Sequence, residues 1–60
     1  MITPEILESW IADLAKSKGF YCRMLRDWRN LTDESKEEYC QYLNDKGIKD
    51  SLGFVLEVEQ

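Results

Sequence analysis

Apolar residues recur along this chain at steps of three and four, and this spacing constrains the fold more than any other feature of the sequence. The first such series is Ile6, Leu7, Trp10, Ile11, Leu14 and Ala15. The charged residues between them fall mostly on the opposite face, which is typical of an amphipathic helix with one side against a core. The spacing therefore predicts an all-α fold.

Helix start signals divide the chain into segments. Thr3 is suited to cap an orphan backbone N–H, and Pro4 stands where its missing N–H costs nothing. Thr32 and Asp50 are the corresponding caps before two later segments. We therefore predict one domain, residues 1–60, made of four short helices at about 4–18, 20–30, 33–46 and 51–58.

Glycines provide the expected stop signals. Gly19 and Gly47 each follow a helical series, and a glycine adopts the left-handed conformation that commonly ends a helix. With Gly19 left-handed, Phe20 is expected to pack back onto the first helix. The predicted core consists of apolar residues from all four helices: Ile6, Leu7, Trp10, Ile11, Leu14, Phe20, Leu25, Trp28, Leu43, Leu52, Val55 and Leu56.

The tail supports two interpretations. Leu52, Val55 and Leu56 follow a helical period, whereas Phe54, Leu56 and Val58 alternate as a strand would. No other segment offers a strand to pair with, so a strand here would need the tail of a second subunit. We therefore expect a helix.

The length of 60 residues limits the core to about 3–5 kcal/mol of stabilisation, so homodimerisation or docking onto a partner is expected to complete the fold. The first residues lack the basic region and the small-residue cleavage site of a signal peptide, and no apolar run reaches membrane length, so we expect a cytoplasmic location. Cys22 and Cys40 are expected to be free thiols in a reducing compartment, with a disulfide between them as the alternative.

The residues needed for catalysis are scarce. The chain has no histidine, no Ser/His/Asp or Cys/His set and no glycine-rich phosphate loop. The two cysteines match no zinc spacing. We therefore predict that the protein is not an enzyme and uses neither a cofactor nor a metal.

Charge is distributed unevenly. Residues 1–15 carry −3, residues 16–30 carry +4 and residues 31–60 carry −5, which sum to the net charge of −4. The positive charge comes from five residues around the second predicted helix, namely Lys16, Lys18, Arg23, Arg26 and Arg29. Arginine beside tyrosine, methionine and tryptophan is typical of interface hot spots. We predict that these five residues bind a protein partner.

Residues 14–28 also resemble a helix-turn-helix, with Ala15 at its small position and Gly19 at its turn. The resemblance implies nucleic-acid binding, with residues 20–30 as the recognition helix. Arg23, Arg26, Asp27 and Asn30 would then face the groove. Lys18 and Tyr21 depart from the motif, and the acidic remainder of the chain opposes DNA binding. DNA binding is therefore the alternative hypothesis.

A second resemblance covers most of the chain. Residues 18–27 (KGFYCRMLRD), the acidic segment after them and the closing KDSLGFVLE are similar to small uncharacterised phage and prophage proteins with a GFYxRxLRD-type run. Cys22 stands where those proteins have a small residue, usually glycine. The resemblance implies an intracellular accessory protein of a mobile element.

Overall fold

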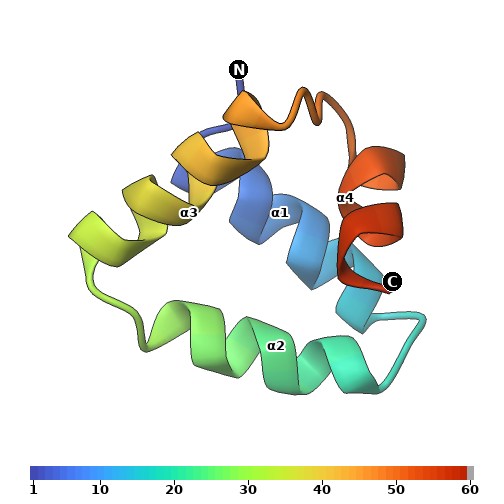
Figure 1. The fold of residues 1–60 in the computed structure, drawn as a ribbon. Helices are drawn as coiled ribbons and strands as arrows, with labels where there is room; N and C mark the ends of the chain where they lie inside the picture. Colours follow the sequence, from blue (N-terminus) through green and yellow to red (C-terminus); the bar gives the residue numbers. More distant parts are fainter. Residues whose placement is uncertain (60) are drawn as a thin grey trace.

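The structure, a computed structural model, describes residues 1–59 as four α-helices joined by short turns (Figure 1). The helices are α1 (Pro4–Ala15), α2 (Phe20–Arg29), α3 (Asp33–Asp45) and α4 (Ser51–Val58). The described residues contain no strand. The predicted all-α domain of four helices is confirmed, and the tail is a helix.

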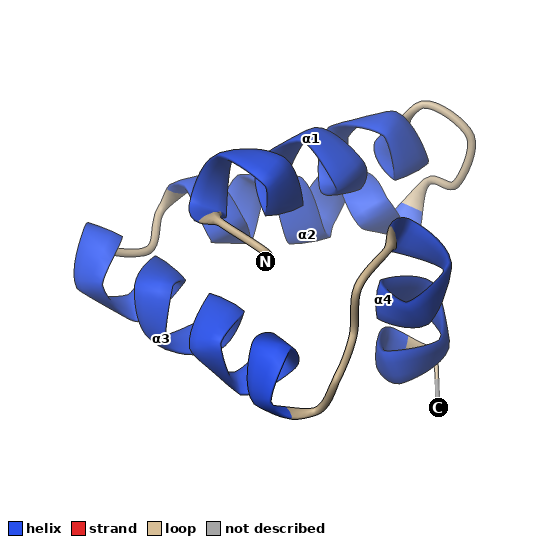
Figure 2. Cartoon of the chain, turned by 90° about the horizontal axis from the view of Figure 1, so that it is seen from above, coloured by secondary structure: helices blue, strands red, loops and turns tan. Residues whose placement is uncertain are grey.

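α1 lies at the centre of the arrangement. α2 runs back alongside α1 in the antiparallel sense, as both views show (Figures 1 and 2), and these two helices make the most extensive contact in the fold. α3 packs against α1 as well. α4 reaches α1 through Phe54, whose ring centroid is 6.4 Å from that of Trp10. All three other helices therefore use α1 as their support.

Three helices begin with the side-chain caps expected from the sequence. Thr3 accepts a hydrogen bond from the Ile6 amide at 3.3 Å, and Thr32 accepts one from the Ser35 amide at 3.1 Å. The Asp50 carboxylate accepts a hydrogen bond from the amide of Gly53 at 2.8 Å. Each bond satisfies a backbone donor that has no partner within its helix.

The two glycines behave differently. Gly47 has a φ of 83° and ends α3 as predicted, with Ile48 N donating to Leu43 O at 3.1 Å in a Schellman arrangement. The prediction for Gly19 was wrong, because its φ is −58° and it is the first residue of the turn into α2. Leu14 O accepts from the amides at 17 and 18, so α1 ends at Ala15 without a left-handed residue.

The core is small and draws on all four helices. It consists of Ile2, Leu7, Ile11, Tyr21, Trp28, Cys40, Leu43 and Phe54, each at most 4% exposed. Leu7, Ile11, Trp28 and Leu43 were predicted correctly, and Trp10, Leu14 and Leu25 pack against the core while partly buried. Val55, another predicted member, is also partly buried.

Four predicted core residues lie at the surface instead. Ile6 is 40% exposed, Phe20 55%, Leu52 66% and Leu56 61%. At the start of α2 the inward aromatic residue is Tyr21 and not Phe20, because α2 starts at Phe20 with no left-handed residue to turn that ring back onto α1. In α4 the side that carries Phe54 faces the core, and the side that carries Leu52 and Leu56 faces the solvent.

Both cysteines are free thiols, but they occupy different environments. Cys40 is buried in the core, and burial raises the pKa of its thiol. Cys22 is exposed on α2, where its Sγ lies 3.4 Å from the carbonyl oxygen of Ala15. Cys40 therefore acts as a small hydrophobic residue of the core, although the predicted core did not include it.

Candidate functional site

The structure separates the five basic residues predicted to bind a partner. Lys18 Nζ lies 3.0 Å from Glu59 Oε2, and Arg29 Nε lies 3.6 Å from Glu8 Oε2, so both are paired with acids of other helices or their ends. Lys18 therefore links the turn before α2 to the end of α4, and Arg29 links α2 to α1. Lys16, Arg23 and Arg26 make no ion pair with another helix within residues 1–59.

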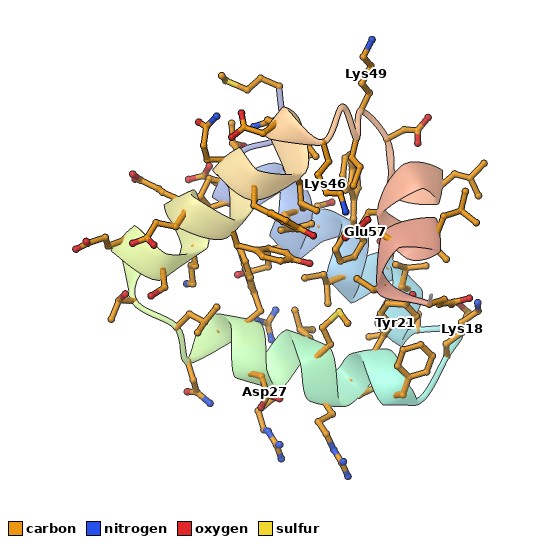
Figure 3. All side chains as sticks on the ribbon, in the orientation of Figure 1. Lys18, Tyr21, Asp27, Lys46, Lys49 and Glu57 are labelled. Carbon is orange, nitrogen blue, oxygen red and sulfur yellow. The ribbon has the colours of Figure 1, made fainter. Side chains whose placement is uncertain are left out.

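Arg23 and Arg26 lie on the solvent-facing side of α2. Among the described residues Arg26 is paired only with its neighbour Asp27, at 3.3 Å, and the two side chains are 68% and 65% exposed. Such a surface pair stabilises a fold by roughly 0–1 kcal/mol, so Arg26 is readily available to a partner. Figure 3 shows Asp27 pointing away from the other helices.

A continuous exposed surface runs along this side of α2. Each member lies three or four residues from another member, and all are exposed: Phe20, Arg23, Arg26, Asp27 and Asn30. We call these five residues the α2 outer strip. Spacings of three and four place side chains on one side of a helix, so an aromatic ring and two arginines are presented together. The charge pattern predicted the arginines, whereas the exposure of Phe20 was missed.

Two ion-pair clusters hold α4 in place. Glu59 Oε2 accepts hydrogen bonds from Lys18 Nζ at 3.0 Å and from the Tyr21 hydroxyl at 3.2 Å. Glu57 Oε2 accepts from the Tyr42 hydroxyl at 2.8 Å and from the Lys46 ammonium at 3.2 Å. Figure 3 shows that Lys18 and Tyr21 lie beside the last turn of α4, next to the connection between α1 and α2. Lys46 comes from the end of α3.

Hydrogen bonds shift the pKa values of both acids. Hydrogen bonds from Tyr42 and Lys46 hold the pKa of Glu57 below its ordinary 4.5, and a hydrogen bond from Lys18 lowers the pKa of Glu59 in the same way. Burial, followed by the contact with Glu59, raises the pKa of Tyr21. The clusters therefore require ionised carboxylates and a protonated phenol.

Acidification is expected to destabilise the protein through these two clusters. A carboxylate whose pKa is lowered on folding stabilises the fold above its unfolded pKa, and this contribution is lost as the pH falls through the lower folded pKa. The melting temperature should therefore fall as the pH drops below about 4.5. Calorimetric scans should show a smaller fall for a Glu57→Gln/Glu59→Gln variant. An equal fall in both proteins would contradict this prediction.

Residues 14–28 depart from helix-turn-helix geometry. The two helices of that motif meet at about 90–120°, whereas α2 runs back alongside α1 (Figures 1 and 2). Gly19 provides no side-chain cap for α2, and Tyr21 is buried in the core. The four residues expected to face DNA are nevertheless exposed together on α2: Arg23, Arg26, Asp27 and Asn30.

Two grooves were not foreseen from the sequence. One, of about 340 Å³, lies between α1 and the start of α3 and is lined by Glu5, Glu8, Asp33 and Lys36 among others. Residues 1–59 contain no group of three or more acids or cysteines arranged to hold a metal ion. The other groove, of about 210 Å³, is almost entirely apolar and lies against α2. The Trp28 ring lines both grooves, and no signal in the sequence indicated either of them.

Comparisons with known proteins provide no relative for this chain. No family model, curated protein or solved structure matches it. None of the helices described within residues 1–59 combines the length and apolar character needed to cross a membrane.

Proposed function

We propose that this chain is a small non-catalytic interaction protein that acts in the cytoplasm and binds an acidic protein partner through the α2 outer strip. The observation that carries the proposal is the state of Arg23 and Arg26. Both are exposed and neither is neutralised by another helix within residues 1–59, although the chain as a whole is acidic. The similarity to phage and prophage proteins supports a role as an accessory factor of a mobile element.

The composition of the α2 outer strip supports a protein partner. Arginine and aromatic residues are enriched at interfaces, because each contributes a large contact area as well as directional hydrogen bonds or packing. Phe20 is 55% exposed beside Arg23, so a partner would gain an apolar contact next to a charged one. Lys16, at the end of α1, adds a further exposed positive charge.

Charge reversal tests the proposal directly. Arg23→Glu should lower partner capture about tenfold, which corresponds to about 1.4 kcal/mol of binding free energy. Tagged wild-type and variant proteins would be used to capture partners from a bacterial lysate, and the captured proteins would be quantified by mass spectrometry. Lys49→Glu is the matched control, because Lys49 is exposed and points away from the body at the end opposite α2 (Figure 3).

Two outcomes would contradict the proposal. One is equal capture by the wild type and by both variants. The other is tight binding to a DNA duplex that weakens steeply between about 50 and 200 mM salt, since DNA binding releases about one counterion for each phosphate neutralised. A sequence-selective shift of that kind, lost in Arg23→Glu, would favour residues 20–30 as a recognition helix.

A further inference from the structure

The groove of about 340 Å³ between α1 and the start of α3 has an acidic lining. A smaller hollow of about 200 Å³ adjoins it, and the two share four lining residues: Pro4, Glu5, Asp33 and Lys36. We call the two hollows together the acidic groove. Its charged residues are four acids and one lysine, which leave a charge of −3: Glu5, Glu8, Asp33, Glu37 and Lys36.

Most of these acids have no basic partner within residues 1–59. Glu8 Oε2 lies 3.6 Å from Arg29 Nε. The other three acids form no ion pair with the described residues: Glu5, Asp33 and Glu37. Burial, followed by the charges of Glu5 and Glu37, raises the pKa of the Cys40 thiol, so carboxylates of α1 and α3 approach the same part of the fold. Repulsion between unpaired carboxylates favours a ligand that brings positive charge to both helices.

The acidic groove also includes a hydrogen-bond donor without an acceptor. Trp28 lines the groove and is 4% exposed, and its indole Nε1 is buried with no hydrogen-bond partner within residues 1–59. Buried donors are nearly always paired, so this one indicates a ligand that supplies an acceptor. Trp28 also lines the apolar groove, where Asp27 is the one charged residue. A polar ligand that reaches the indole is therefore held better from the acidic groove, which offers charged groups from two helices.

We infer that the acidic groove binds a basic peptide segment of another protein. Lysine or arginine side chains of this segment pair with acids of the groove, and one of its backbone carbonyl groups accepts the hydrogen bond from Trp28 Nε1. A peptide supplies both the cations and the acceptor, whereas a polyamine supplies only cations. A metal ion does not fit, since residues 1–59 contain no three acids or cysteines placed to hold one. The α2 outer strip is basic, so the two surfaces select partners of opposite charge.

Titration with a lysine peptide tests this site. The peptide is short, has capped ends and alternates lysine with glycine, and its control has glutamine in place of each lysine. At about 50 mM salt the wild type should bind the lysine peptide with a Kd below about 1 mM, and the glutamine peptide about tenfold more weakly. In two-dimensional NMR spectra the indole N–H resonance of Trp28 should move downfield as its hydrogen bond forms. The indole resonance of Trp10, which does not line the groove, should stay in place.

Two double variants of equal net charge locate the site. Glu5→Gln/Glu37→Gln removes two acids of the groove and should bind the lysine peptide about tenfold more weakly than the wild type does. Glu34→Gln/Glu38→Gln removes two exposed acids of α3 that do not line the groove, and its affinity should stay within about twofold of the wild type. Each variant loses one acid from the first turn of a helix, so their effects on helix stability are matched. Circular dichroism checks that both keep their helices.

Three results would overturn the inference. The first is no binding of the lysine peptide to the wild type at about 1 mM. The second is equal weakening in the two double variants, which would show general attraction to an acidic protein. The third is binding that leaves the Trp28 indole resonance in place. Arg23→Glu should bind the lysine peptide no more weakly than the wild type does, so failure at this groove is distinguishable from failure of partner binding at the α2 outer strip.

Discussion

Replacing Phe54 with alanine is expected to unfold most of the protein at 25 °C. Phe54 is 1% exposed and is the one fully buried side chain of α4, where its ring packs near that of Trp10. Phe→Ala changes in a core cost about 3–5 kcal/mol, because apolar contacts are lost and a cavity remains. A core of this size supplies about that much in total. Far-UV circular dichroism should therefore show a large loss of helix.

The second phenylalanine provides a matched control for this change. Phe20 is 55% exposed, so Phe20→Ala removes the same atoms from a surface site. The free energy of unfolding of the Phe20→Ala variant should differ from that of the wild type by about 0.5 kcal/mol or less, as is usual for surface substitutions. Equal destabilisation by the two variants would show that the packing of Phe54 does not hold α4 to the fold.

The helices and most of their ends could be predicted from the sequence, because these features depend on local interactions. The apolar spacing, the caps Thr3, Thr32 and Asp50, and the stop at Gly47 each act within a few residues. The end of α1 at Ala15, before the predicted end at residue 18, was missed. The amides of residues 16–18 bond to the last carbonyl groups of α1, so the helix ends without a left-handed Gly19.

The side of each helix that faces the core could not be predicted as reliably. In α4 the leucines give the strongest apolar pattern, yet Phe54 faces inward, and Glu57 and Glu59 are bound by Tyr42 and Lys18 from outside the helix. These hydrogen bonds join positions 15 and 41 residues apart. The short-range apolar pattern contains no information about such distant polar partners.

The candidate site was predictable in composition but not in arrangement. The clustering of positive charge identified all five basic residues, and the structure then divides them by their partners. Lys18 and Arg29 pair with acids that lie far away in the sequence, whereas Arg23 and Arg26 remain on the outer side of α2. The distinction rests on tertiary contacts, so only the folded arrangement could reveal it.

A second large loss of stability is expected from Asn44→Ala. The Asn44 carboxamide accepts a hydrogen bond from the Ile2 amide at 2.8 Å and donates one to the Ile2 carbonyl at 3.1 Å. These two bonds fix the start of the chain against α3, with the Ile2 side chain 4% exposed. Each bond is worth roughly 0.5–1.5 kcal/mol, and Ile2 then loses part of its burial. The variant should lose about 2–3 kcal/mol in urea unfolding.

Gln41→Ala is the matched control for Asn44→Ala. It also removes an amide side chain from α3, but it leaves the two hydrogen bonds between Asn44 and Ile2 in place. Within residues 1–59, the Gln41 side chain bonds only to Asp45 on the exposed face of the same helix, at 2.8 Å, and such a pair contributes about 0.2–0.5 kcal/mol. Its unfolding midpoint should therefore stay close to that of the wild type. If the two variants lost equal stability, the change in α3 itself would account for the effect and Ile2 would not be held by Asn44. Relaxation measurements on the Ile2 amide should show faster motion in Asn44→Ala alone, because only that substitution releases the first residues from the core.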